Sequence, residues 1–353
     1  MTKKTVLIAG GGFAGLACAK ALAQRGVATT LLERKAQAGV GMHTTGIIVK
    51  ECADEFEIPD SVTRKVTDVR LYAPNLRHMD LASSDYFFLT TDTPALMRYF
   101  ADEAIKAGTN IIFDTSYDKA TQIGDEIIVN DGVYKADYLI GADGPRSKVA
   151  DDFALGQNTE FLLGAEAEYT GLPLHDTNAF YCFLDQNLAH GYLGWVIPGV
   201  GVAQVGVAQR MPRKPDIEAF TKNMKPLFDF SEAKVVARRG GLIPCGGLVK
   251  PFATGRVFLL GDAAGIVSPL TAGGIHTALR YGKILGETLA HYINNGGEHP
   301  AEILERIYPR FHIKLAMRKA FELTPNWMLN ASIGNPLFAY AASKVFYQKK
   351  RLK

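Results

Sequence analysis

Cysteine is scarce in this chain of 353 residues, and no long apolar run is present. The four cysteines have neither a C-x-x-C pattern nor metal-ligand spacing, which predicts buried, reduced thiols in a reducing compartment and no metal site (Cys18, Cys52, Cys182 and Cys245). None of the apolar runs reaches the length that spans a bilayer. The first apolar run is short and leads directly into glycines, so we expect a strand rather than a signal peptide.

Charge of one sign is also lacking, because 39 basic side chains face 36 acidic ones and the formal net charge is only +3. This balance excludes the strongly basic signature of a nucleic-acid-binding protein. Repeats, low-complexity tracts and long linkers are absent. Length and composition then predict a globular, cytoplasmic protein of two or three domains.

What the sequence has is a strand–helix–strand pattern near its start, VLIAGGGFAGLACAKALAQRGVATTLLERK. Val6–Ile8 predicts a buried parallel strand, Ala14–Gln24 has the spacing of a helix, and Thr29–Leu32 predicts a second strand. The N-terminus of a helix in such a unit is suited to bind phosphate.

Four residues in this stretch indicate a dinucleotide site. Gly10, Gly12 and Gly15 fit G-x-G-x-x-G, in which the glycines allow a tight turn, an approach of the backbone to a pyrophosphate, and packing of helix on strand. Glu33 ends the second strand, where an acid binds ribose hydroxyls. An acid at this position disfavours the 2′-phosphate of NADP. NAD and FAD therefore remain as the candidate cofactors.

Two later motifs favour FAD over NAD. The stretch DYLIGADGPRSKV (137–149) is a strand followed by a basic turn, and GRVFLLGDAAGIVSPLTAGGIHTAL (255–279) is a strand, an acid and a glycine-rich helix start. Asp262 at a strand end can accept hydrogen bonds from the ribityl hydroxyls of a flavin. The helix start at Gly274 offers free N–H groups to the electron-rich edge of the flavin ring.

The predicted fold class is α/β, with a Rossmann-like FAD-binding domain built from discontinuous segments and an inserted antiparallel-sheet substrate domain. We expect FAD-binding segments at 1–70, 90–158 and 251–298, a substrate domain at 159–250 to which 71–89 contributes, and a C-terminal helical region at 299–353. The patterns also predict helices at 93–106, 273–294 and 301–323, a strand at 110–113, and a hairpin at 123–138 that turns at Asn130-Asp131-Gly132.

The order of these motifs resembles the FAD-dependent monooxygenase and reductase superfamily typified by p-hydroxybenzoate hydroxylase. Within it, GGLIPCGG (240–247) and LLGDAAGIVSPLTAGGI (259–275) resemble the geranylgeranyl reductases, which saturate isoprenoid double bonds. The resemblance covers 5–287 and implies these flavin contacts: Ala14, Gly15, Glu33, Arg34, Thr44, Thr45, Arg98, Asp262, Gly274 and Ile275. Arg98 could instead be a solvent-exposed arginine on its helix.

The chain departs from the reductase pattern in two places. Thr44 stands where many of these reductases have a cysteine, so chemistry that relies on the thiol is absent and His43 becomes a candidate proton donor. The family has an aromatic signature, Y-x-W-x-F-P, that lines the substrate cavity. In this chain Trp195 and Pro198 match it, while Leu193 replaces the tyrosine and Ile197 the phenylalanine. Tyr192, the second candidate catalytic residue, is one position away, which on a strand places it on the opposite face from Leu193. Trp195 could also belong to the core.

The resemblance implies a FAD-dependent reductase of carbon–carbon double bonds in an apolar isoprenoid, polyene or lipid substrate. The alternatives are a flavin-dependent monooxygenase of an aromatic or lipid substrate and a non-catalytic flavin-binding lipid sensor or carrier. The same stretch resembles W-x-W-x-I-P of flavin halogenases, but Leu193 replaces the first tryptophan and no catalytic lysine is matched. Because no second dinucleotide fingerprint is present, the reductant is NAD(P)H that docks transiently or a separate electron-carrier protein.

The C-terminal stretch combines large apolar side chains with cations. Pro336 is suited to start a helix, and Leu337, Tyr340 and Lys344 then follow helical spacing. A basic cluster ends the chain (Lys349, Lys350, Arg351 and Lys353). Such a helix either closes over the protein's own core or makes peripheral contact with an anionic membrane.

Overall fold

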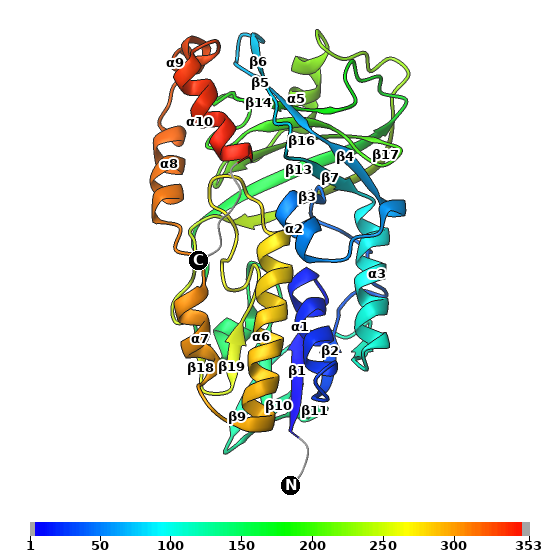
Figure 1. Cartoon of the computed structure of the whole chain (residues 1–353), viewed down its shortest axis with the longest axis vertical. Coiled ribbons are helices and arrows are strands. Elements are labelled where there is room, and N and C mark those ends of the chain that lie inside the picture. Colours follow the sequence, from blue (N-terminus) through cyan, green and yellow to red (C-terminus); the bar gives the residue numbers. More distant parts are fainter. Residues whose placement is uncertain (1–3, 348–353) are drawn as a thin grey trace. The chain divides into compact units, whose positions relative to one another are not determined.

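The computed structural model describes residues 4–347 and divides into two compact units, each made of three segments (Figure 1). Unit 1 comprises 1–41, 94–160 and 244–312, and unit 2 comprises 42–93, 161–243 and 313–353. The first segment of unit 1 ends at Gly41, whereas the sequence pattern suggested an extension to residue 70. The reason is strand pairing, because the strands at 47–49 and 63–66 pair with a third strand at 88–91 inside unit 2.

Unit 1 contains a mostly parallel six-stranded sheet. Its order is β18 (Ala253–Thr254), β19 (Val257–Leu259), β12 (Tyr138–Gly141), β1 (Thr5–Ala9), β2 (Ala28–Leu32) and β8 (Asn110–Ile112). Only β18 runs antiparallel to its neighbour. Val6, Leu7 and Ile8 of β1 are almost completely buried, which explains the uninterrupted apolar run at this point of the sequence. The predicted α/β class is confirmed.

The helices of unit 1 are α1 (Phe13–Ala23), α3 (Thr93–Lys106, from Pro94 on), α4 (Lys148–Asp152), α6 (Ile275–Asn295) and α7 (Pro300–Ile307). Figure 1 shows α6 alongside α1. Two glycines allow this contact: a Cβ on Gly282 would lie 2.5 Å from the Ala14 carbonyl oxygen, and one on Gly286 would lie 2.6 Å from that of Cys18. The backbones of the two helices therefore touch without intervening side chains.

Two predicted elements are wrong in part. The helix expected at 301–323 is two helices, α7 and α8 (His312–Glu322), because Pro309 forces Tyr308 out of the helical conformation, to a ψ of 141°. The expected hairpin is a three-stranded sheet of β9 (Ala120–Ile123), β10 (Glu126–Val129) and β11 (Tyr134–Ala136). Its predicted turn at 130–132 is present, with Asn130 and Asp131 at positive φ, but the turn at Gly124 was missed.

Unit 2 contains a seven-stranded sheet. Its order is β17 (Lys234–Pro244), β13 (Phe161–Thr170), β16 (Ala203–Arg210), β15 (Gly194–Pro198), β14 (Ala179–Phe183), β5 (Asp68–Tyr72) and β6 (His78–Leu81). Strands β13 to β14 pair antiparallel in this order, as predicted, whereas β14 and β5 are parallel. A small sheet, β3 (Ile47–Val49), β7 (Phe88–Thr91) and β4 (Thr63–Val66), belongs to the same unit.

Side chains alternate between the two faces of the large sheet. Tyr181 and Val196 face α5 (Ile217–Met224), within an apolar cluster that includes Phe220 of that helix. Cys182 and Trp195 face the other side, with apolar side chains of α9 (Asn326–Ser332) and α10 (Pro336–Tyr347). The unit also contains the short elements α2 (Lys50–Glu55) and η1 (Asp60–Val62), and α8 from residue 313 on. Among the described residues, no helix is both long enough and apolar enough to cross a membrane.

Candidate functional site

The glycine turn of unit 1 leaves open space at the start of α1. Gly10 has a φ of +107°, and a Cβ on it would lie 2.2 Å from the Ala142 carbonyl oxygen. Gly12 is the N-cap of α1 and gives its N–H groups no side-chain acceptor. A Cβ on Gly12 would meet nothing within 4 Å. Free N–H groups beside open space suit a pyrophosphate.

Glu33 lies at the end of β2, as predicted. One carboxylate oxygen accepts a hydrogen bond from the Gly11 N–H at 2.7 Å, and the other accepts one from the Lys35 N–H at 3.0 Å. These bonds fix the carboxylate beside the glycine turn and leave lone pairs for ribose hydroxyls. Arg34 and Arg98 are exposed, and Arg98 lies on α3. Their flavin contacts stay predictions.

Asp262 carries the clearest signal of a missing partner. Its carboxylate has no hydrogen-bond partner among residues 4–347, and burial raises its pKa to about 6. A Cβ on Gly274 would lie 3.7 Å from the Asp262 Oδ1, so the carboxylate faces the start of α6. Gly274 caps that helix without a side-chain acceptor, and Ile275 begins it as a buried residue. A ligand hydroxyl would satisfy the carboxylate, which fits a ribityl chain.

Two further contacts hold these turns in place. The Asn158 side-chain amide donates to the Pro145 carbonyl at 3.1 Å and to that of Asp262 at 2.8 Å, which joins the two later motifs. Ala14 packs against the turn before Asp262, because a Cβ on Gly261 would lie 2.8 Å from the Ala14 Cβ. Sequence reasoning missed Asn158, since it belongs to no motif and lies 104 residues from Asp262.

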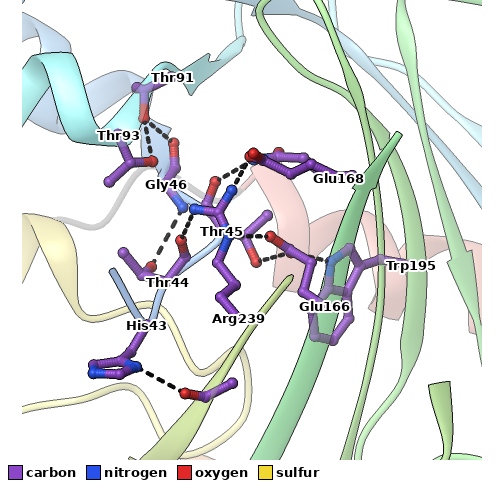
Figure 2. A network of polar contacts seen from close by, with 12 residues as sticks. His43, Thr44, Thr45, Gly46, Thr91, Thr93, Glu166, Glu168, Trp195 and Arg239 are labelled. Carbon is purple, nitrogen blue, oxygen red and sulfur yellow. Dashed lines mark hydrogen bonds and ion pairs between the residues drawn. The ribbon is translucent and has the colours of Figure 1, made fainter. Parts of the chain in front are cut away.

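In unit 2, the loop before β3 is held by polar contacts from several strands (Figure 2). The Thr45 hydroxyl donates to a Glu166 carboxylate oxygen at 2.6 Å, and the Thr44 carbonyl accepts from Arg239 at 3.0 Å. The Gly46 carbonyl accepts from the Thr91 hydroxyl at 2.9 Å. Thr44 and Thr45, the flavin contacts that the resemblance assigns to this unit, therefore belong to an ordered loop.

His43 precedes these threonines in the same loop. Its Nδ1 lies 2.8 Å from the Gly240 carbonyl, which can only accept, so Nδ1 carries the proton of this hydrogen bond. The ring is otherwise exposed. The neutral imidazole thus presents Nε2 as an acceptor.

A buried ionic cluster underlies the loop, and sequence reasoning missed it. The Arg239 Nε lies 3.0 Å from a Glu166 carboxylate oxygen, and another Arg239 nitrogen pairs with Glu168. The side chains of Arg239 and Glu166 are only 9% and 4% exposed. Burial raises the pKa of Glu166, while the Arg239 guanidinium and the hydrogen bonds from Thr45 and Trp195 act in the opposite direction. One guanidinium therefore pairs with two carboxylates.

Trp195 belongs to the same cluster. Its Nε1–H donates to Glu166 at 2.7 Å, and the residue is only 8% exposed. Trp195 is on β15 and Glu166 is on β13, and β16 lies between these two strands. Gly206 of β16 pairs with Trp195 on one side and with Glu166 on the other, so the indole crosses β16 at this glycine. A Cβ on Gly206 would lie 2.3 Å from the indole ring. The absence of that side chain is what lets the indole meet the carboxylate.

The remaining predicted cavity residues lie around Trp195. Ile197 shares its apolar cluster, and Tyr192 and Leu193 pack against that cluster together. The expectation that Tyr192 and Leu193 face opposite sides is wrong, because β15 begins only at Gly194 and the Tyr192 N–H closes a turn onto Ala189. Burial raises the pKa of the Tyr192 phenol. The buried Pro198 carbonyl accepts from the Thr90 hydroxyl at 2.8 Å.

Comparison with known proteins agrees with the geometry of unit 1. Residues 3–306 match the family described as an FAD binding domain. The chain belongs to this family.

FAD is thus the cofactor of this family member, an FAD-dependent oxidoreductase. The chain is 28% identical over 320 residues to digeranylgeranylglycerophospholipid reductase 3 of Methanosphaera stadtmanae, covering 82% of this chain and 78% of that protein. It is also 28% identical over 320 residues to the chloroplastic geranylgeranyl diphosphate reductase of Oryza sativa subsp. japonica, covering 82% and 67%. A geranylgeranyl bacteriochlorophyll reductase-like protein from Thermoplasma acidophilum has the same fold, with a TM-score of 0.83, 18% identity, and coverage of 98% and 96%.

The residues of unit 1 suit the parts of FAD. The open N-terminus of α1 suits the pyrophosphate, Glu33 the adenosine ribose, and the unpartnered Asp262 the ribityl hydroxyls. The start of α6 at Gly274 and Ile275 offers N–H groups to the flavin ring.

We expect Asp262→Asn to act in opposite directions on cofactor binding and on the apoprotein. FAD affinity should fall by about 1–3 kcal/mol, because an amide accepts fewer hydrogen bonds than a carboxylate. The apoprotein should become more stable above pH 6 by about 1–2 kcal/mol, since the pKa of Asp262 is raised from 3.8 to about 6 and ionisation of a buried acid disfavours folding. Below pH 4 the gain should vanish.

Fluorescence titration with FAD and urea unfolding at pH 4 and pH 7 check both effects. The control is Asp102→Asn, which makes the same change at an exposed position of α3. A pH-independent stability difference for Asp262→Asn would contradict the assignment of a half-buried carboxylate that has no hydrogen-bond partner among the described residues.

The ionic cluster of unit 2 predicts a large effect for Arg239→Met. The substitution keeps much of the side-chain volume but leaves Glu166 and Glu168 without their cation, which should cost about 3–5 kcal/mol. Urea unfolding measures the loss. Arg238→Met, at the exposed neighbouring position of β17, should change stability by less than about 0.5 kcal/mol. Equal losses in the two variants would show that the cluster has no special role.

Proposed function

We propose that this chain reduces carbon–carbon double bonds of an apolar isoprenoid or polyene lipid. The observation that carries the proposal is the cofactor site of unit 1, with an unpartnered Asp262 facing the start of α6, in a chain whose relatives are named as geranylgeranyl and digeranylgeranylglycerophospholipid reductases. FAD, when bound and reduced, supplies the hydride for such a reduction.

The apolar side chains of unit 2 suit the substrate. An isoprenoid chain has no charged group along its length, so it is bound by apolar contact and exclusion of water. Leu193, Trp195, Ile197 and Pro198 are the residues proposed to line the cavity. The Trp195 indole is fixed by its bond to Glu166, so it can present a rigid wall.

His43 is the proposed proton carrier. Reduction of an alkene needs a proton on the second carbon. The His43 Nδ1–H is held by the Gly240 carbonyl, which leaves Nε2 to take up a proton from water and pass it on. The alternative donor, Tyr192, holds its proton more tightly because burial raises its pKa. The proposed electron source is NAD(P)H that docks transiently or a separate carrier protein.

Mass spectrometry of a lipid extract tests the reaction. A cellular lipid extract is analysed before and after incubation with dithionite-reduced protein, with Asp262→Asn protein as the control that lacks full FAD affinity. We expect a gain of two mass units for each reduced bond, and loss of this gain in the control. A gain of sixteen mass units in the presence of oxygen would identify a monooxygenase instead, and no change with any lipid would leave a flavin-binding lipid carrier.

We also propose that the C-terminal helices of unit 2 contact a membrane surface. Leu337 and Tyr340 of α10 are 80% and 65% exposed, and Trp327 of α9 is 69% exposed. The Lys344 ammonium lies 5.2 Å from the Tyr340 ring, so a cation accompanies the apolar side chains. The opposite side of α10 packs on the core through Phe338. The terminal basic cluster lies outside the described residues.

Vesicle binding tests this contact. Leu337→Gln with Tyr340→Gln should weaken co-sedimentation with anionic vesicles about tenfold or more, because each exposed apolar side chain that enters the interface contributes ~1 kcal/mol. These substitutions keep the core face of α10, which a truncation would remove. Ile123→Gln with Val133→Gln, on the exposed hairpins of unit 1, is the matched control. Equal binding of both double variants would contradict the membrane contact.

A further inference from the structure

We propose that Glu166 is a positioning residue, which holds the His43–Gly46 loop and the Trp195 indole in one fixed arrangement. One carboxylate oxygen of Glu166 accepts from both the Thr45 hydroxyl, at 2.6 Å, and the Trp195 Nε1–H, at 2.7 Å. The proposed functional parts of unit 2 therefore share a single acceptor. The role of this arrangement in catalysis rests on the proposed FAD-dependent reduction.

The loop is fastened to the sheet on both sides of Glu166. The Thr45 carbonyl accepts from the Gln204 side chain of β16 at 3.0 Å, and the Thr44 carbonyl accepts from Arg239 of β17 at 3.0 Å. Three neighbouring strands thus hold two consecutive residues of a segment without regular structure, as Figure 2 shows for Glu166 and Arg239. Movement of Glu166 would release Thr45 and the indole together.

The chemistry of the site requires a carboxylate. Thr45 and Trp195 donate to one carboxylate oxygen of Glu166, and the Arg239 Nε lies 3.0 Å from the other oxygen as an ion-pair partner. A glutamine in this position has one acceptor oxygen, and its amide would place a donor against one of these donors. Glu168 lies in the next row of the sheet, where it pairs with Arg239 and accepts from Gln204 at 3.2 Å. It shares the cation, but its described contacts include neither Thr45 nor Trp195.

This difference gives a matched pair of variants, Glu166→Met and Glu168→Met, because methionine keeps the side-chain length but has no acceptor oxygen. Each removes one negative charge from the same cluster, and each leaves Arg239 paired with the other carboxylate, so both should fold. Only Glu166→Met removes the acceptor that Thr45 and Trp195 share, whereas a glutamine would keep one oxygen in that place. An effect of cluster charge would appear in both variants, whereas an effect of positioning would appear in one.

Tryptophan fluorescence reads the indole directly. The chain has two tryptophans, and Trp327 is 69% exposed, so Trp327→Phe leaves Trp195 as the reporter. In this background we expect Glu166→Met to shift the Trp195 emission maximum and to increase acrylamide quenching at least twofold. The dissociation constant of FAD should rise at least fivefold. Glu168→Met and the exposed Glu232→Met should stay within twofold of the parent in both measurements.

Equal changes in Glu166→Met and Glu168→Met, or none in either, would overturn the positioning role. Circular dichroism of each variant shows whether the fold is kept. A Glu166→Met protein that fails to fold while Glu168→Met folds would replace positioning with a purely structural role. Both measurements are made without lipid substrate. Failure of the alkene reduction would therefore leave the positioning result intact, and failure of the positioning test would leave the reduction intact.

Discussion

Direct contact between the backbones of α1 and α6 is the constraint on which the cofactor site depends. Gly282 and Gly286 of α6 lie against the carbonyl groups of Ala14 and Cys18, where a Cβ would come within 2.5–2.6 Å of an oxygen. Helices in such close contact cannot slide along each other, so the position of the N-terminus of α1 relative to that of α6 is fixed. The free N–H groups of the first are suited to a pyrophosphate and those of the second to a flavin ring, which is the proposed arrangement of FAD. Glycine in the middle of a helix costs about 0.5–1 kcal/mol relative to alanine, and the contact explains why these positions lack side chains.

The carboxylates of the two units differ in whether they have partners. In unit 1 the Asp262 carboxylate has no hydrogen-bond partner among the described residues, and burial raises its pKa to about 6. In unit 2 the carboxylates of Glu166 and Glu168 are paired with Arg239 and with hydrogen-bond donors. A half-buried carboxylate with no described partner is suited to bind a ligand, whereas one that accepts two hydrogen bonds and pairs with a cation is suited to hold neighbouring residues in place.

The sequence alone predicts the residues of the proposed cofactor site, whereas it does not predict the cluster of unit 2, and the reason is physical. Gly10, Gly12, Glu33 and Asp262 act where the backbone turns at the end of a strand, so their chemistry is visible in local order and spacing. The break between α7 and α8 was equally local, because Pro309 was present in the sequence and its effect was overlooked. Asn158, by contrast, acts across 104 residues and leaves no local pattern.

Strand periodicity explains why Glu166 and Glu168 were overlooked. In the segment GAEAEYT, acids alternate with small or apolar residues, which is the pattern of a strand with one face in water. The structure puts both acids on the face that carries Trp195, and Arg239 of the neighbouring strand supplies the charge that makes their burial tolerable. Alternation identifies which residues share a face, but it does not identify which face is solvated. Burial of the acidic face depends on Arg239, which lies more than seventy residues further along the chain. An alternating acidic pattern therefore does not by itself show that a strand face is exposed, because a distant arginine can pair with the acids and make their burial possible.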